Sequence, residues 1–227
     1  MTREPIRLRA LDLFCGAGGA SVGLYLAGFD VVGVDIKPQP HYPPFIEFVL
    51  IDVLACDSKW VGSFDLVWAS PPCQSFTAYR RRPKHVRPAL NLIPQTRSLL
   101  EQSRVECYII ENIPGAKAHL INPVQLCGSS FGLDVRRHRL FECCGFNPAA
   151  PPCNHAWQTP RFPPATNRRN LRCTVEVGVG VYRIPLQAQQ RAMGIDWMQL
   201  GELSQAIPPA YAEHLGRQAM NSLGKRL

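Results

Sequence analysis

Four side chains that can do chemistry lie at or just beyond the predicted ends of strands in this sequence: Asp35, Asp52, Cys73 and Glu111. A deprotonated cysteine is a nucleophile, and carboxyl groups hold protons or accept hydrogen bonds. Cys73 stands in "SPPCQSF", a loop stiffened by the two preceding prolines. The chain has nine cysteines, so Cys73 is either a nucleophile or one more buried thiol. A lone Pro-Pro-Cys favours the second interpretation, and only its neighbours can favour the first.

The elements that must position these residues alternate between strands and helical or loop crossovers. Apolar stretches predict strands over residues 7–14, 29–35, 45–52, 64–70 and 107–112, with two further strands over 124–133 and 136–144. Helices are expected after the glycine-rich turn at 15–19 and over residues 91–104, 186–193 and 208–223. This order predicts an α/β fold with a doubly wound, mostly parallel sheet. Ligands of such sheets bind at the carboxyl ends of the strands, so the four side chains are expected along one rim.

The turn after the first strand, "DLFCGAGG", predicts a site for a ligand. Glycines at 16, 18 and 19 let a ligand approach the backbone, although their spacing is not G-x-G-x-x-G. Asp35 can accept hydrogen bonds from both hydroxyls of a ribose, and Asp52 from the amino group of an adenine. Each aspartate alone would be read as a cap or turn residue. Together they favour an adenosine-type cofactor.

Charge and composition narrow the class of partner and the compartment. The net charge of +8 and the pI near 9.2 favour a polyanion, nucleic acid first and a membrane surface second. We expect a cytoplasmic protein without a membrane span, because no signal-peptide pattern and no long apolar run is present. Reduced thiols are expected for the odd number of cysteines, with Cys107 and Cys127 as plain core residues.

Four motifs resemble the cytosine-C5 DNA methyltransferase family, in the family's order: "LDLFCGAGG", "SPPCQSF", "ENIPG" and "RRHRLF". The resemblance covers residues 8–141 and returns more weakly at 186–215. It implies a Rossmann-like methyltransferase domain, here residues 1–143 plus 186–227, that uses S-adenosylmethionine. The implied cofactor-binding residues are Phe14, Gly16, Gly18, Asp35, Ile36, Asp52, Val53, Leu92 and Gln205.

The same resemblance implies the reaction. Cys73 would add to C6 of a flipped-out cytosine in DNA and make C5 nucleophilic toward the methyl group. Glu111 would hold a proton against N3, which requires a pKa raised by burial. Arg137 and Arg139 match the family's paired arginines near the target base, where positive charge would favour the Cys73 thiolate. We expect the protein to act as a monomer.

Contacts to nucleic acid are expected from two basic segments. The loop after the nucleophile would engage phosphates as it closes over the base, and "RFPPATNRRNLR" would lie along a backbone. The candidate residues are Gln74, Arg80, Arg81, Arg82, Lys84, Arg87, Arg168 and Arg169.

The sequence departs from the family at three places. Val135 stands where the family has a glutamine before its arginines, and Ser204–Gln205 stand where it has Gly-Asn. Only residues 144–185 are available for a target-recognition subdomain, which predicts a small irregular one. A short or relaxed recognition sequence, or a substrate other than duplex DNA, is expected from so little chain.

No metal site is predicted, because the cysteines of the 143–155 region lack a C-x-x-C pair. If zinc did bind there, the candidate ligands would be Cys143, Cys144, Cys153 and His155.

Two alternatives to DNA methylation stay open. The first keeps the chemistry and changes the substrate to single-stranded nucleic acid, RNA or a free cytosine nucleotide, which the small recognition region favours. The second is a non-catalytic nucleic-acid-binding module, which Val135 and the altered Gly-Asn site favour. The retained Cys73, Glu111 and aspartates argue against that module. A prokaryotic or phage origin is expected.

Overall fold

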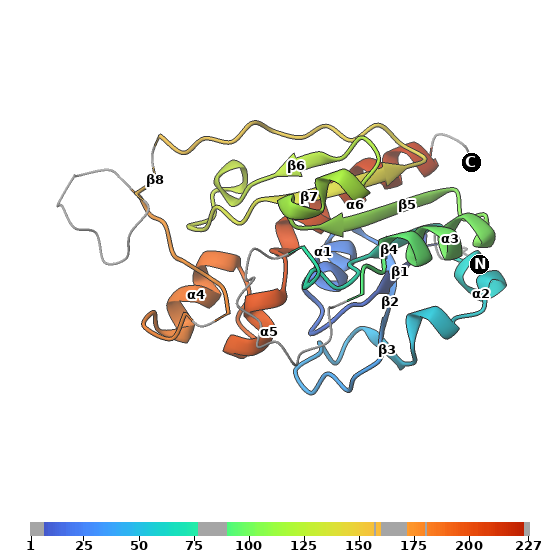
Figure 1. Cartoon of the computed structure of the whole chain (residues 1–227), viewed down its shortest axis with the longest axis horizontal. Helices are drawn as coiled ribbons and strands as arrows, with labels where there is room; N and C mark the ends of the chain where they lie inside the picture. Colours follow the sequence, from blue (N-terminus) through green and yellow to red (C-terminus); the bar gives the residue numbers. More distant parts are fainter. Residues whose placement is uncertain (1–6, 77–89, 157, 160–171, 180, 225–227) are drawn as a thin grey trace, which may run out of the picture.

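Seven strands form one twisted sheet in a computed structural model that describes residues 7–76, 90–156, 158–159, 172–179 and 181–224 (Figure 1). The order across the sheet is β3-β2-β1-β4-β5-β7-β6. The strands from β1 to β5 pair in parallel, and β7 runs antiparallel to both β5 and β6. The predicted mostly parallel sheet is confirmed. The strands are β1 (Arg9–Leu13), β2 (Asp30–Asp35), β3 (Glu47–Leu50), β4 (Leu66–Ala69), β5 (Cys107–Asn112), β6 (Val124–Leu126) and β7 (Arg139–Cys144).

Helices cover both faces of the sheet, as the doubly wound prediction requires. Helices α1 (Gly19–Ala27) and α6 (Pro209–Gly224) pack on the face to which Ala10 and Trp68 point. Helices α2 (Ser58–Val61) and α3 (Ile93–Ser103) lie over the other face, where Leu11 contributes to the core. Both faces of the central strands are therefore buried, which is why these strands are apolar almost throughout.

Close packing of α1 against α6 depends on glycine at the contact. A Cβ atom on Gly23 would lie 2.2 Å from the carbonyl oxygen of Pro209. Only a residue without a side chain lets the two backbones approach this closely. The glycines of "GGASVG" thus serve helix packing as well as the turn.

A third, smaller core joins the C-terminal elements to the segment before them. Helices α4 (Leu186–Met193) and α5 (Leu200–Gln205) enclose Met193, Met198 and Leu203 together with Val175 and Ile184. This core crosses the predicted boundary at 185/186, because Val175, Val177, Val181 and Ile184 pack with the helices that follow. Strands β8 (Gln158–Thr159) and β9 (Arg172–Cys173) form a separate two-stranded parallel ladder. The division into a catalytic domain and a recognition subdomain stays a prediction.

Most predicted elements form close to their expected limits, and one is shorter. The strand expected over 124–133 ends at Leu126, because a 3₁₀ turn follows at Gly128–Phe131. The Gly128 N–H donates to the Arg136 carbonyl at 2.8 Å, which folds the chain back before β7. The other 3₁₀ turns are η1 (Val53–Ala55) and η2 (Pro114–His119), and the turn at 128–131 is η3. The short helices α2 and α5 were not predicted.

Among the described residues, no helix is both long enough and apolar enough to cross a membrane.

Substituting Gly23→Ala is expected to destabilise the protein, because the new methyl group meets the rigid backbone of Pro209. Overpacking of this kind costs about 1–3 kcal/mol of unfolding free energy, or more where backbone must move. Gly201→Ala is the matched control: it also lies in a helix, and nothing lies within 4 Å of its added Cβ. Denaturant unfolding should show a loss for the first variant and equal or higher stability for the second. Equal stability of the Gly23→Ala variant would contradict the packing described.

Candidate active site

A cavity of about 600 Å³ opens where β1, β2, β4 and β5 end at their carboxyl termini. In Figure 1 the arrow of β5 points to the side of the molecule on which α4 and α5 lie. The volume is in the usual range for a small-molecule site. The cavity brings together nine of the predicted site residues: Phe14, Gly16, Asp35, Ile36, Cys73, Gln74, Glu111, Arg139 and Gln205.

The glycine-rich turn forms one wall of the cavity and is bonded to the end of β2. Phe14, Gly16 and Gly18 all have positive φ, at 61°, 51° and 84°. The Gly16 N–H donates to Asp35 Oδ2 at 3.0 Å, and the Lys37 N–H donates to Asp35 Oδ1 at 2.9 Å. The Asp35 carboxylate thus holds the glycine-rich turn against the end of β2. Beside it Ile36 is 59% exposed, an apolar surface that suits a flat ring.

Four predicted binding residues do not line the cavity. Gly18 packs against Tyr42 and Pro43, and Asp52 Oδ1 accepts the Leu54 N–H at 2.9 Å to cap η1. Val53 is buried in the core, and Leu92 caps α3. The roles of Asp52, Val53 and Leu92 at a cofactor therefore stay predictions.

Asp12 is a site residue that the sequence reasoning missed. It lies on β1, is fully buried and lines the cavity. Ser21 Oγ donates to Asp12 Oδ2 at 2.5 Å, and the Tyr42 hydroxyl donates to Ser21 Oγ at 2.9 Å. Burial raises the pKa of Asp12 to about 7, and Oδ1 has no hydrogen-bond partner. The available signal was a carboxylate in the middle of an otherwise apolar strand.

The opposite wall of the cavity contains an acid beside an arginine. Antiparallel pairing sets Glu111 of β5 opposite Phe141 of β7, and Arg139 lies two residues from Phe141 along the same strand. Arg139 is therefore a diagonal neighbour of Glu111, and its Nε lies 3.1 Å from Glu111 Oε1. Burial raises the pKa of Glu111, although Arg139, Arg137 and a hydrogen bond with Ser70 each act to lower it. The predicted rise in this pKa is confirmed in direction.

The loop that carries Cys73 is tied to β5 next to this pair. Asn112 Nδ2 donates to the carbonyl of Pro71 at 2.9 Å, and the Phe76 N–H donates to the carbonyl of Cys73 at 2.9 Å. Asn112 follows Glu111 directly in the sequence, so one strand end supplies the acid and the clamp for the nucleophile loop. This second role of "ENIPG" was not recognised from the sequence.

The pKa of the Cys73 thiol is raised above that of a free cysteine. Burial is the largest cause of its raised pKa, and the nearby charge of Glu111 adds to it. Arg139 and Arg137 act to lower the pKa, as the sequence predicts, but burial outweighs them. Removal of the negative charge of Glu111 would therefore favour the Cys73 thiolate.

Arg137 is a clamp between segments and does not line the cavity. Its guanidinium donates to the carbonyls of Ala206 at 2.7 Å, Ser204 at 2.8 Å and Val177 at 3.2 Å. Burial lowers the pKa of Arg137 to about 9. Its φ of 34° is unusual for a residue with a side chain. Because Ser204 and Ala206 flank Gln205, this clamp holds Gln205 at the cavity.

The remaining nucleic-acid candidates, Arg80, Arg81, Arg82, Lys84, Arg87, Arg168 and Arg169, lie outside the described residues. Val135, where the family has a glutamine, is buried in the third core.

The family model for C-5 cytosine-specific DNA methylase matches residues 8–124. The chain belongs to this family. The matched part contains the glycine-rich turn, Asp35, Cys73 and Glu111, and the methylase family's arginine segment and C-terminal helices lie beyond it. This confirms the resemblance inferred from the motifs.

Two curated methylases are each similar to about half of the chain. The Type II methyltransferase M.AgeI of Thalassovita gelatinovora is 31% identical over 48% of this chain and 28% of its own length. The Type II methyltransferase M.AquIA of Picosynechococcus sp. is 28% identical over 47% of this chain and 49% of its own length. The match thus spans less than half of each relative.

The crystal structure of the Dnmt2 methyltransferase of S. pombe has a similar fold. The TM-score is 0.63 at 15% identity, with 96% of this chain and 99% of that chain covered. The likeness confirms the Rossmann-like methyltransferase fold.

The raised pKa of Asp12 makes stability fall with pH. The unfolded chain ionises this group near pH 4, whereas the native state keeps the proton to about pH 7, so stability is lost across that interval. Asp12→Asn removes the effect and should gain roughly 2–3 kcal/mol relative to the native protein between pH 5 and pH 7. Denaturant unfolding at each pH measures the difference. The exposed Asp30→Asn is the control. A difference in unfolding free energy between Asp12→Asn and the native protein that does not change with pH would contradict the raised pKa of Asp12.

Glu111→Gln is expected to lower the pKa of the Cys73 thiol, because it removes the negative charge and leaves Arg139 in place. The rate of Cys73 alkylation by iodoacetamide, followed by peptide mass spectrometry, should rise at a lower pH in this variant. Alkylation of the exposed Cys144 in the same samples provides the internal control. Identical pH profiles for Cys73 in both proteins would show that Glu111 does not govern the thiol.

Proposed function

We propose that this protein transfers a methyl group from S-adenosylmethionine to C5 of cytosine in DNA, through a covalent bond between Cys73 and C6. One observation carries the proposal: a single cavity joins the glycine-rich turn and Asp35 to Cys73, Glu111 and Arg139. Neither the glycine-rich turn with Asp35 nor the group around Cys73 would alone indicate this function, since glycine turns and buried thiols are both common.

The cofactor half of the cavity fits S-adenosylmethionine. Asp35 lies where ribose hydroxyls would bind, Ile36 offers an apolar surface, and the turn at Phe14 and Gly16 brings backbone close to the ligand. The unpartnered Oδ1 of Asp12 lies in the wall of the same cavity and favours a ligand with a hydrogen-bond donor. Gln205 would close the site from α5. When bound, S-adenosylmethionine supplies an electrophilic methyl group.

The first step belongs to Cys73. Its thiolate adds to C6 of cytosine, and the electron pair of the C5–C6 double bond makes C5 nucleophilic. Negative charge then develops on the ring. Glu111, whose pKa is raised by burial, holds a proton against N3 and accepts a hydrogen bond from the exocyclic amine. Thymine lacks that amine, so the same carboxyl discriminates between the two bases.

The arginines have different parts in this scheme. Arg139 lines the cavity and pairs with Glu111, so it offers positive charge to the ring as the adduct forms. Arg137 acts as a positioning residue, because all three of its described hydrogen bonds go to backbone carbonyls.

Release of the product breaks the bond between Cys73 and C6. Once C5 carries the methyl group, its proton leaves to a base, the C5–C6 double bond reforms and the Cys73 thiolate is expelled. Since a cytosine stacked in a duplex cannot reach Cys73 in the cavity, the base has to be flipped out of the helix.

Cys73→Ser is expected to abolish methyl transfer, with at least a thousandfold loss, because a serine hydroxyl is not ionised near neutral pH. Binding of the cofactor should change little, since the turn and Asp35 lie elsewhere in the cavity. Radiolabelled methyl transfer and calorimetric binding measure the two effects. Cys144→Ser, at an exposed cysteine of β7, is the control and should retain activity. Normal turnover by the Cys73→Ser variant would refute the mechanism.

The substrate is tested by comparing duplex DNA, single-stranded DNA, tRNA and dCMP as acceptors, with the product mapped as 5-methylcytosine. Transfer to duplex DNA supports the proposal, and exclusive transfer to another acceptor selects the alternative chemistry. Cofactor binding without transfer to any acceptor selects the non-catalytic module. The monomeric state and the cytoplasmic location stay predictions.

A further inference from the structure

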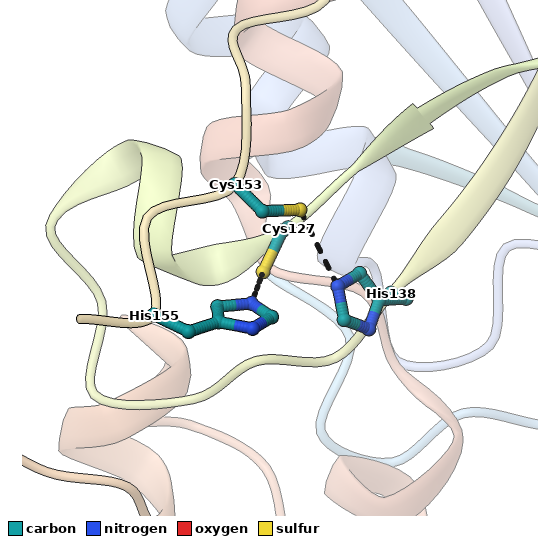
Figure 2. Close-up of side chains that lie close together, drawn as sticks. All are labelled: Cys127, His138, Cys153 and His155. Carbon is teal, nitrogen blue, oxygen red and sulfur yellow. Dashed lines mark hydrogen bonds between the residues drawn. The ribbon is translucent and has the colours of Figure 1, made fainter. Parts of the chain in front are cut away.

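Two cysteines and two histidines converge at the edge of the sheet away from the proposed active site. Figure 2 shows the side chains of Cys127, His138, Cys153 and His155 pointing toward one another. Their potential ligand atoms all lie within 4.8 Å of one another. Cys127 Sγ is 3.2 Å from His155 Nε2, and Cys153 Sγ is 3.4 Å from His138 Nε2.

The four residues come from three segments that the fold brings together. Cys127 follows β6, His138 directly precedes β7, and Cys153 and His155 lie in the irregular segment after β7. Pairing of β6 with β7 sets the first two side by side, with Leu126 opposite Arg139. The segment at 153–155 then folds back over them.

The spacing of the ligand atoms is that of a tetrahedral zinc site. With Zn–S bonds of about 2.3 Å and Zn–N bonds of about 2.0–2.1 Å, the edges of the tetrahedron measure roughly 3.3–3.8 Å. The two sulfur–nitrogen distances of 3.2 and 3.4 Å are a few tenths of an ångström shorter than the sulfur–nitrogen edge of roughly 3.6 Å, so small side-chain shifts would fit the ligands to one ion. Two thiols and two imidazoles form the ligand set of many structural zinc sites.

Hydrogen bonding alone accounts poorly for this arrangement. A thiol is a weak donor, yet both thiols contact an imidazole nitrogen, and Cys127 Sγ does so while also lying 3.1 Å from Ser129 Oγ. A disulfide between Cys127 and Cys153 would leave the convergence of His138 and His155 without a purpose.

We propose that Cys127, His138, Cys153 and His155 bind one zinc ion with a structural role. Four protein ligands complete the tetrahedron, so the ion has no open position for catalysis. The sequence predicts no metal site and offers four weak candidates, of which Cys153 and His155 belong to the cluster, whereas Cys143 and Cys144 lie in β7 and do not. Cys127, expected as a plain core residue, becomes a ligand.

The ion would fasten the beginning of the predicted recognition region to the catalytic domain. Residues 147–155 have no helix or strand and are held largely by side-chain hydrogen bonds, among them Ser130 Oγ to the Pro152 carbonyl at 2.8 Å and the Ala149 N–H to Gln218 Oε1 at 2.6 Å. His138 lies between Arg137 and Arg139, so zinc binding would also hold the arginine segment in place. Metal ligation provides folding free energy where a segment is too small to bury a core.

The test measures zinc in the full-length chain, purified without chelator, then reduced, reconstituted with zinc and dialysed. Elemental analysis should find about one zinc ion per chain. Cys153→Ser and His155→Ala should each lose at least nine-tenths of the bound zinc or bind it at least 100-fold more weakly. Cys144→Ser and Cys143→Ser are matched controls on the neighbouring strand and should keep full occupancy.

Cobalt(II) in place of zinc gives a second readout that does not require activity. The native chain should show the visible bands of tetrahedral cobalt and a thiolate-to-metal charge-transfer band, and the Cys153→Ser variant should lose most of both. Reduced protein that holds no zinc after reconstitution would overturn the proposal, as would zinc retained by both ligand variants. Titration of seven thiols in place of nine, with Cys127 linked to Cys153 and no metal bound, would also overturn it. Because metal content is measured without methyl transfer, failure here leaves the proposed function untouched.

Discussion

A buried carboxylate needs a partner, and the pair of Glu111 with Arg139 meets that need at the centre of this protein. Glu111 ends a strand whose neighbours exclude water on both sides. An unpaired charge there would be costly, so the strand that supplies Arg139 has to lie beside β5. The antiparallel insertion of β7 between β5 and β6 is the topological consequence. This pairing sets Glu111 and Arg139 together in the wall of the cavity.

The pairing also explains how the two halves of the chain meet. Arg139 is the first residue of β7, and Arg137 lies just before this strand. The Arg137 guanidinium donates hydrogen bonds to the backbone on both sides of Gln205. The end of α5 is thereby attached to the wall of the cavity. The cysteine–histidine cluster includes His138, which lies between Arg137 and the start of β7. One short segment, residues 134–139, thus connects the catalytic wall, the C-terminal helices and the base of the predicted recognition region.

Burial has opposite consequences at the two reactive groups of the cavity. It raises the pKa of Glu111, which prepares that group to carry a proton, and it raises the pKa of Cys73, which suppresses the thiolate. If Cys73 is the nucleophile, as proposed, its thiolate is disfavoured while the neighbouring Glu111 carboxylate carries its charge. A cytosine that shares a proton with Glu111 at N3 would neutralise this carboxylate, which links activation of the thiol to the arrival of the correct base. A cysteine controlled in this way is protected from oxidation and alkylation while no substrate is bound.

The order of strands and helices, the parallel sheet and the rim with Asp35, Cys73 and Glu111 were all predictable from the sequence. The reason is local: apolar runs of strand length, glycine turns and prolines report on their own neighbourhood, and the carboxyl ends of parallel strands share one edge. Family motifs then identified the chemistry. Asp12 was not predicted as a site residue, because its importance arises from its burial, and one charged residue within a strand sequence does not reveal burial.

What only the tertiary structure decided depends on contacts between distant segments. Whether Arg137 lines the cavity or clamps backbone depends on where α5 packs, some 65 residues later in the chain. The proposed zinc ligands differ from the weak candidates of the sequence for the same reason. Cysteines adjacent in sequence, Cys143 and Cys144, alternate across β7, whereas Cys127 and His138 become neighbours through strand pairing. Local patterns determine which elements form, and the packing of those elements determines which side chains meet.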